Sequence, residues 1–297
     1  MREGREREAV RVVSPAKINW FLDVGSRRAD GYHEVQTVMQ MVSVADVIEC
    51  RATDDGAITL TTDGMPCGGS PDDNLVVRAA RAARAHLRMK KGARIKLTKR
   101  IPVAAGLGGG SSNAAAVLRA VQRVWCVHIA PEDLRVIARA LGADVAFFLG
   151  TPAAACTGIG ELLSPLTPRC HWLVLWNPGM PLSTKAVYAA FDERPRLHRD
   201  MAAFLGAYSG HGAGRMADAV WNNLGLAAEE CLPRLRTMQE EARACGARAA
   251  WISGSGPTVA ALCDDEPHAS RLAAALRGRA SGQDVLLVCH TLTELPE

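Results

Sequence analysis

The sequence has 297 residues, of which 48% are hydrophobic and 22% are charged, and its formal net charge is +4. This composition is typical of a folded globular protein and excludes a disordered or fibrous chain. The length favours two packed domains over one. The small, scattered positive charge gives no reason to expect a nucleic-acid partner, and it is compatible with a small anionic substrate.

The nine cysteines are spread from Cys50 to Cys289 without a C-x-x-C pair or a local Cys/His cluster. Neither a zinc site nor a disulfide scaffold is therefore expected. No apolar run reaches the ~20 residues of a membrane-spanning helix, and the charged N-terminus lacks the apolar core of a signal peptide. We expect a cytoplasmic protein with reduced thiols, without a membrane partner and without a metal held by protein ligands.

Extended segments dominate the start of the chain, before any clear helix. They are Val10–Val13, Ile18–Val24, Val35–Val42, Val47–Ala52 and Ile58–Thr62. This order differs from repeated βαβ units and indicates an α+β fold. A helix is predicted after Asp72-Asp73-Asn74, because these residue types commonly cap helices. A strand at 94–97 then leads into a glycine-rich loop, and helices follow at 113–124 and 131–141.

The segment Ser164–Pro168 is the expected boundary, which divides the chain into domains 1–166 and 167–297. The predicted strands of the second domain are His171–Trp176, Ala249–Ser253, Val259–Cys263 and Val285–His290. Its predicted helices are Lys185–Phe191, Leu232–Ala244 and His268–Leu276. The order β, helices, β, β, α, β is that of a ferredoxin-like split βαβ unit. The segment Arg194–Ala219 is left without an assignment.

The glycine-rich loop lies directly before a predicted helix. Its sequence is Gly106-Leu107-Gly108-Gly109-Gly110-Ser111-Ser112. Glycine is needed where a backbone adopts a positive φ or approaches a ligand closely. A helix N-terminus presents unpaired N–H groups and partial positive charge, which together favour a bound anion. The loop therefore predicts a phosphate site, in which Ser111 and Ser112 can contact phosphate oxygens or a magnesium ion.

Other glycine motifs do not fit this spacing. A Walker A loop requires a lysine after its second glycine, a dinucleotide-binding loop requires a glycine where Ser111 stands, and the other protein-kinase motifs are missing. A glycine-rich turn without a ligand remains the alternative. A second glycine loop, Ser253-Gly254-Ser255-Gly256-Pro257-Thr258, is on spacing alone either a strand connection or a ligand contact. It does not match the nucleophile elbow of acyl hydrolases.

The two loops, together with Ser14-Pro15-Ala16-Lys17-Ile18-Asn19, resemble the three motifs of the GHMP small-molecule kinase superfamily, in order. The segments Arg28–His33, Asp73–Leu75 and Gly142–Val145 resemble the diphosphocytidyl-methylerythritol kinase branch of that superfamily. The resemblance covers nearly the whole chain. It implies a ribosomal protein S5 domain 2-like N-terminal half and a ferredoxin-like C-terminal half, with the active site in the cleft between them.

The resemblance also implies a reaction and its participants. ATP is the co-substrate, Mg²⁺ accompanies the nucleotide, and the γ-phosphoryl group passes to the 2-hydroxyl of a cytidine diphosphate-linked methylerythritol. A monomer or a weak homodimer is expected. The alternatives are another GHMP kinase, acting on homoserine or mevalonate for example, and a nucleotide-binding protein without catalysis.

By this resemblance the catalytic residues are Lys17 and Asp144. Phosphoryl transfer needs an oriented hydroxyl, a proton acceptor and positive charge near the transferred group. Asp144 is the expected general base, and Lys17 is expected to polarise the hydroxyl and to keep Asp144 ionised. Taken without the resemblance, Asp144 could cap a helix and Lys17 could be a solvated strand residue.

The resemblance assigns further residues to the two substrates. The expected ATP-binding residues are Asn74, Lys99, Pro102, Gly106, Leu107, Gly108, Gly109, Gly110, Ser111 and Ser112. The expected acceptor-binding residues are Asn19, Tyr32, His33, Thr184 and Tyr188. Tyr32 and Tyr188 can stack on cytosine, and His33 can meet its polar edge. The alternatives are a helix cap for Asn74, an exposed lysine at 99, and ordinary packing for the two tyrosines.

Two positions depart from the pattern of this branch. Ala146 stands where proline is common, and Asn222-Asn223-Leu224-Gly225 replaces an Asn-Asp-Leu-Glu pattern. Neither departure removes a proposed catalytic group. We expect them to alter local geometry and the fit of the second-domain helices, and turnover to be modest.

Overall fold

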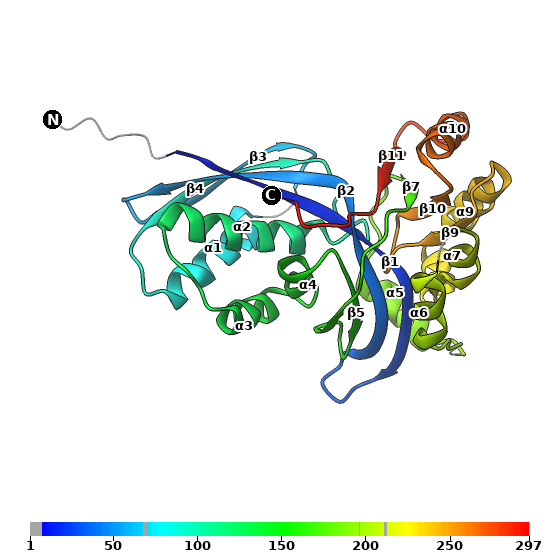
Figure 1. The fold of residues 1–297 in the computed structure, drawn as a ribbon, viewed down its shortest axis with the longest axis horizontal. Coiled ribbons are helices and arrows are strands. Elements are labelled where there is room, and N and C mark those ends of the chain that lie inside the picture. Colours follow the sequence, from blue (N-terminus) through cyan, green and yellow to red (C-terminus); the bar gives the residue numbers. More distant parts are fainter. Residues whose placement is uncertain (1–7, 68–69, 196, 211–212, 297) are drawn as a thin grey trace.

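The computed structural model describes residues 8–67, 70–195, 197–210 and 213–296, and two sheets with their helices account for most of them (Figure 1). The strands are β1 Val10–Arg27, β2 His33–Thr53, β3 Ile58–Gly64, β4 Gly92–Lys99, β5 Ala153–Thr157, β6 Leu162–Pro165, β7 Trp172–Asn177, β8 Trp221–Asn222, β9 Ala249–Ile252, β10 Val259–Cys263 and β11 Val285–His290. The α-helices are α1 Leu75–His86, α2 Gly109–Trp125, α3 Pro131–Leu141, α4 Val145–Gly150, α5 Thr184–Asp192, α6 Met201–Ser209, α7 Ala213–Ala219, α8 Gly225–Cys231, α9 Arg234–Ala244 and α10 Glu266–Arg277. This mixture confirms the predicted α+β class. In these ranges no helix is both long and apolar enough to cross a bilayer.

The first sheet has the strand order β3-β4-β2-β1-β8. β5 pairs with residues 37–40 of β2, on the edge that also pairs with β4, and β6 pairs with β5. β1 and β2 are longer than predicted, because each joins two segments that the sequence pattern separates. In β1 the junction falls at Pro15, where the pairing with β2 shifts register between Pro15 and Ala16. A proline is tolerated in a strand at such an irregularity.

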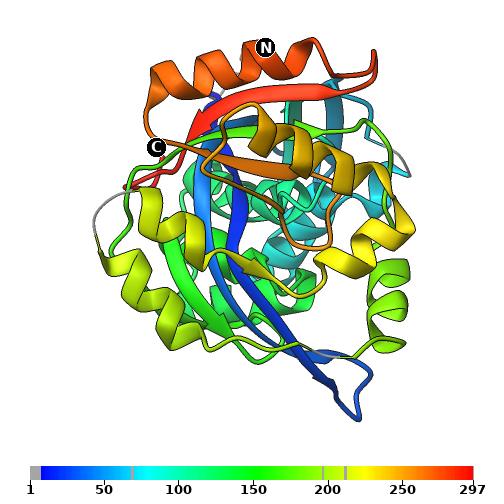
Figure 2. The same cartoon turned by 90° about the vertical axis from the view of Figure 1, so that its right-hand side faces the viewer.

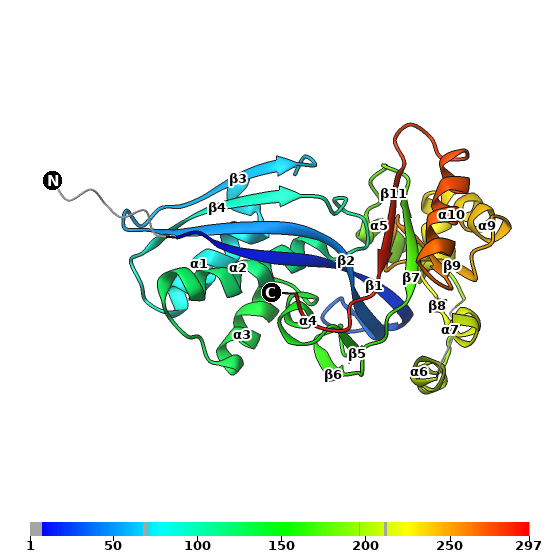
Figure 3. The ribbon, with the colours of Figure 1, turned by 45° about the horizontal axis from the view of Figure 1, so that its top comes forward.

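Helices α1 to α4 cover one face of the first sheet (Figures 1 and 3). Apolar side chains of β2 and β4, such as Ile48 and Ile95, pack there against Val117 of α2 and Phe148 of α4. α1 starts as predicted after Asn74, whose side-chain oxygen accepts a hydrogen bond from the backbone N–H of Val76 at 3.0 Å. α2 begins four residues before the predicted start, so the glycine loop runs directly into its first turn.

The second sheet has the order β11-β7-β10-β9, and all its neighbours are antiparallel. In chain order this is the arrangement 4-1-3-2, which confirms the predicted ferredoxin-like half. α9 and α10 pack on the outer face of the sheet, where Leu235 and Leu272 join its core. Figure 2 looks onto this half, with α10 and β11 at the top and the hairpin of β1 and β2 reaching past it to the lower right.

The inner face of the second sheet packs against β1. Trp20 of β1 stacks on Trp251 of β9, with ring centroids 5.2 Å apart. β8 pairs in parallel with β1, so the second half of the chain adds a strand to the first sheet. The segment that the sequence pattern left unassigned forms α6 and α7, although residues 196 and 211–212 lie outside the described ranges. The proposed boundary at 166/167 stays a prediction.

Candidate active site

The glycine loop turns sharply before α2, and two of its glycines have backbones that other residues rarely adopt. φ is 74° at Gly106 and 67° at Gly108, which is the N-cap of α2. A Cβ on Gly106 would lie 2.2 Å from the carbonyl oxygen of Ser253, and one on Gly108 would lie 3.0 Å from Lys17 Cγ. The loop therefore needs glycine at both positions, and its backbone approaches the neighbouring segments closely.

The second glycine loop packs on the first. Ser253 Oγ donates a hydrogen bond to the carbonyl oxygen of Gly106 at 3.2 Å. The side-chain amide of Asn222 donates to the carbonyl oxygens of Ile252 and Gly254, at 2.7 and 2.8 Å. Asn222 belongs to the segment that departs from the branch pattern, and here it anchors the second loop. The contact brings the two sheets together at the glycine loops.

Lys17 lies under the first glycine loop and is almost fully buried. Its Nζ donates to Asn19 Oδ1 at 2.5 Å and to the carbonyl oxygen of Gly106 at 2.9 Å. Burial lowers the pKa of this ammonium, while the charge of Asp144 opposes the shift. The alternative of a solvated strand residue is therefore wrong. An ammonium has three N–H donors, so the third can be directed at a ligand.

Asp144 is the residue immediately before α4 and is half-buried. Its side chain makes no capping hydrogen bond to the helix, so capping does not explain an aspartate at this position. Its charge also acts on Tyr188, where burial and Asp144 together raise the phenol pKa to about 12. The carboxylate thus lies within electrostatic range of groups on β1 and α5.

Two cavities meet at the glycine loop. A cavity of about 1030 Å³ has Lys17, Asn19 and Asp144 on its wall. A cavity of about 340 Å³ lies on the other side of the loop and is lined by Asn74, Lys99 and Pro102. The residues on the walls of both cavities are Gly106, Gly108 and Ser111. A group bound at the loop can therefore face both spaces.

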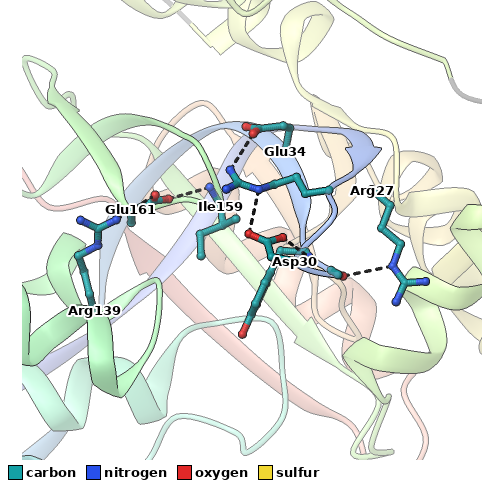
Figure 4. A network of polar contacts seen from close by, with 9 residues as sticks. Arg27, Asp30, Glu34, Arg139, Ile159 and Glu161 are labelled. Atoms are coloured by element: carbon teal, nitrogen blue, oxygen red, sulfur yellow. Dashed lines mark hydrogen bonds and ion pairs between the residues drawn. The ribbon is translucent and has the colours of Figure 1, made fainter.

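The larger cavity extends to the tip of the β1–β2 hairpin. Tyr32 at this tip lines it and is 61% exposed, while His33 is buried with its ring centroid 5.1 Å from that of Tyr188. Arg28 holds the turn through Asp30 and Glu34, at 3.1 and 2.8 Å (Figure 4). The three aromatic side chains that the sequence assigns to cytosine thus lie at one end of one cavity.

A buried polar network around Asp46 lies next to the smaller cavity. Asp46 is fully buried and accepts a hydrogen bond from Lys99 Nζ at 2.5 Å. It also accepts from the backbone N–H groups of Arg100 and Ile101 and from the side chain of Asn113. The alternative of an exposed lysine at position 99 is therefore wrong. Asn74 caps α1 and also lines the cavity, and its contact with ATP stays a prediction.

Two residues assigned to ATP do not line either cavity. Ser112 is fully buried, and its Oγ lies 2.8 Å from Ser14 Oγ, so its hydroxyl stabilises the junction of α2 with β1. The side chain of Leu107 is buried in the core between the halves. The sequence pattern does not distinguish the seven positions of the loop, whereas in the structure the first turn of α2 already has an inner face.

Several residues on the wall of the larger cavity were not predicted from the sequence, including Arg27, Thr37, Lys185 and Asp192. Of these, Asp192 carries a signal that the sequence does contain. It follows Tyr188 by four positions in a helix, so both side chains share one face. Thr184 precedes Tyr188 by the same interval, and its Oγ1 lies 2.9 Å from Ser255 Oγ.

Comparison with known proteins agrees with this geometry. The family model for the N-terminal domain of GHMP kinases matches residues 74–151, and that for their C-terminal domain matches residues 207–281. The 4-diphosphocytidyl-2-C-methyl-D-erythritol kinase of Shouchella clausii is 34% identical over 270 residues, which are 90% of each chain. The chain belongs to this kinase family. A crystal structure of 4-(cytidine 5′-diphospho)-2C-methyl-D-erythritol kinase, 36% identical, matches with a TM-score of 0.79 over 95% of this chain and 99% of that one.

Membership of the 4-diphosphocytidyl-2-C-methyl-D-erythritol kinase family confirms the resemblance and the two-domain GHMP kinase fold expected from the sequence. A homoserine kinase from Cytophaga hutchinsonii is 19% identical, with a TM-score of 0.73 over 100% of this chain and 98% of that one. At this identity the match concerns the fold alone.

Proposed function

We propose that the chain transfers the γ-phosphoryl group of ATP to the 2-hydroxyl of 4-(cytidine 5′-diphospho)-2-C-methyl-D-erythritol. The observation that carries this proposal is the glycine loop shared by two cavities, with Lys17 and Asp144 on the larger side. The Shouchella clausii relative, at 34% identity, and the kinase of the matching crystal structure, at 36%, are named as kinases of this substrate. As a member of that family, the chain is an ATP-dependent small-molecule kinase.

ATP is proposed to bind with its base in the smaller cavity and its phosphates on the loop. The N-terminus of α2 offers N–H groups and partial positive charge at Gly109 and Gly110. Both glycines line the smaller cavity of about 340 Å³, which gives a phosphate room beside these N–H groups. The γ-phosphoryl group then faces the larger cavity.

Asp144 and Lys17 are proposed to act on the acceptor hydroxyl. Asp144 takes the proton as the hydroxyl oxygen forms its bond to phosphorus and the bond to the leaving ADP oxygen breaks. Lys17 can direct its third N–H at the phosphoryl or hydroxyl oxygen, since Asn19 and Gly106 receive the other two. Lys17 lies on β1 and Asp144 directly before α4, so these elements position both side chains and little reorganisation of the site is needed for the transfer.

Mg²⁺ bound to the phosphate oxygens supplies charge neutralisation in such a transfer. Ser111 is the residue on the shared wall whose hydroxyl fits a contact to the ion or to phosphate. In the described part of the chain, no three His, Cys, Asp or Glu side chains gather into a metal site. We propose that the ion arrives with the nucleotide.

The cytosine ring is proposed to lie between Tyr32 and Tyr188, beside His33. Tyr32 exposes most of its ring, so it can cover the base when the substrate enters.

We also propose a cytoplasmic monomer or weak homodimer, with thiols that stay reduced. All nine cysteines are free, which supports a reducing compartment.

The direct test is ADP release by the purified protein with ATP, Mg²⁺ and the cytidylyl substrate. Homoserine, mevalonate and the methylerythritol phosphate without cytidylyl are tested in parallel. Turnover confined to the cytidylyl substrate is the expected result. Turnover with another acceptor would support a kinase but contradict the assignment of a cytosine site. Nucleotide binding without any turnover would indicate a non-catalytic protein.

A further inference from the structure

One face of α5 lines the larger cavity over the whole length of the helix. Thr184, Tyr188 and Asp192 are spaced four residues apart and all lie on the cavity wall. Val187 and Phe191 are buried on the side that packs in the core of the second half. The amphipathic spacing of α5 therefore places a carboxylate in the same row as the tyrosine proposed to stack on cytosine.

Asp192 contacts the other half of the molecule through His33. Its Oδ1 lies 2.8 Å from His33 Nε2, and the two side chains are 25% and 6% exposed. His33 is the first residue of β2, directly after Tyr32, whereas Asp192 is the last residue of α5. The contact therefore connects the element that carries Tyr32 with the element that carries Tyr188.

The chemistry of this pair determines which nitrogen of His33 carries a proton. An ionised carboxylate only accepts hydrogen bonds, so Nε2 must be the donor. In the neutral ring Nδ1 is then an acceptor, and the ring cannot rotate without breaking a charge-assisted bond. The ring of His33 also packs against Tyr188 and Phe191, with centroids 5.1 and 6.4 Å away.

We propose that Asp192 is a positioning residue for the base-binding end of the larger cavity, and that it acts through His33. It fixes the tautomer and orientation of His33 and holds α5 at the distance from Tyr32 that a pyrimidine ring requires. This inference rests on the proposed cytidylyl substrate. It goes beyond that proposal by naming a residue that sets affinity for the cytidine part and leaves the nucleotide loop unaffected.

The test measures binding of cytidine 5′-diphosphate and of ADP by titration calorimetry to the full chain. Asp192→Ala weakens binding of cytidine 5′-diphosphate about tenfold, as expected for a lost charge-assisted hydrogen bond, and leaves that of ADP within about twofold. Asp192→Asn keeps an oxygen that can accept from Nε2, so affinity stays within about threefold of wild type. In a His33→Ala background, Asp192→Ala adds less than about twofold, because its effect passes through His33.

A matched control removes a carboxylate that pairs at the same end of α5 but outside the cavity. Glu230 pairs with Arg194, which follows α5, and Glu230→Ala is expected to leave both affinities unchanged. Unchanged affinity for cytidine 5′-diphosphate in Asp192→Ala would overturn the inference, as would equal losses for both ligands or additive effects with His33→Ala. Wild-type protein that binds cytidine 5′-diphosphate without phosphorylating the cytidylyl substrate would contradict the proposed function alone.

Discussion

The ammonium group of Lys17 and the carbonyl oxygen of Gly106 are 2.9 Å apart, and this hydrogen bond joins β1 to the glycine loop across 89 positions of the chain. The backbone N–H of Lys17 also donates to the carbonyl oxygen of Leu107, at 2.9 Å. The proposed catalytic cation and the proposed phosphate site are therefore one structural unit. A substitution in either one should therefore alter the position of the other.

Burial of Lys17 makes a prediction about stability and pH. Its folded-state pKa is below 10.5, so between the folded value and 10.5 the unfolded chain binds one proton more than the native protein. The free energy of unfolding therefore rises with pH in that window, by at most about 1.4 kcal/mol per pH unit for this group. Lys17→Met removes this pH-dependent contribution to the free energy of unfolding. Urea unfolding of both proteins from pH 7.5 to 10 should show wild type gaining stability relative to the variant, and parallel curves would contradict this assignment.

Gly106→Ala should separate the two glycine loops. The new Cβ meets the Ser253 carbonyl at 2.2 Å on a backbone with φ 74°, so we expect a loss of more than about 2 kcal/mol in unfolding free energy. ATP affinity should fall with it. Gly206→Ala in α6 is the matched control, because nothing lies within 4 Å of its Cβ and alanine favours a helix. Equal stabilities of the two variants would show that the loop tolerates a side chain.

The buried pair of Asp46 and Lys99 predicts non-additive effects. Asp46→Asn leaves the Lys99 ammonium buried without its counter-charge, at a cost of about 3–5 kcal/mol in unfolding free energy. Asp46→Asn combined with Lys99→Met removes both charges and should recover part of that loss. Denaturant unfolding of the three variants measures the coupling. Additive losses would mean that the two charges do not stabilise each other.

Tyr32→Ala tests the cytosine site. Loss of a stacking partner should raise KM for the cytidylyl substrate about tenfold, while KM for ATP stays within about twofold. Tyr32→Phe is the control, since it keeps the ring and should retain nearly wild-type KM. An unchanged KM in Tyr32→Ala would remove Tyr32 from this role.

Local patterns predicted most elements and the ferredoxin-like order of the second half. They could not predict that Pro15 lies inside a continuous strand, because a register shift depends on the partner strand. They also could not separate Ser111 from Ser112, which differ only in the face of α2 that each occupies.

The contacts between distant segments of the site could not be predicted from the sequence. Asn222 holds the second glycine loop, and Ser253 of that loop meets the first one, only because the second sheet packs on β1, and no local spacing encodes this. Asp192 is different, since its helical spacing from Tyr188 was visible. Its partner His33 was not, because the two are 159 positions apart.

The central claim is that Asp144 accepts the proton of the acceptor hydroxyl beside the glycine loop. The most direct measurement is kcat of Asp144→Asn with the cytidylyl substrate, together with calorimetric ATP binding to the same protein. We predict that kcat falls about 10²–10⁴-fold, as expected for a lost general base, while ATP affinity is retained. A kcat near the wild-type value with normal ATP binding would contradict the assignment of Asp144 as the base.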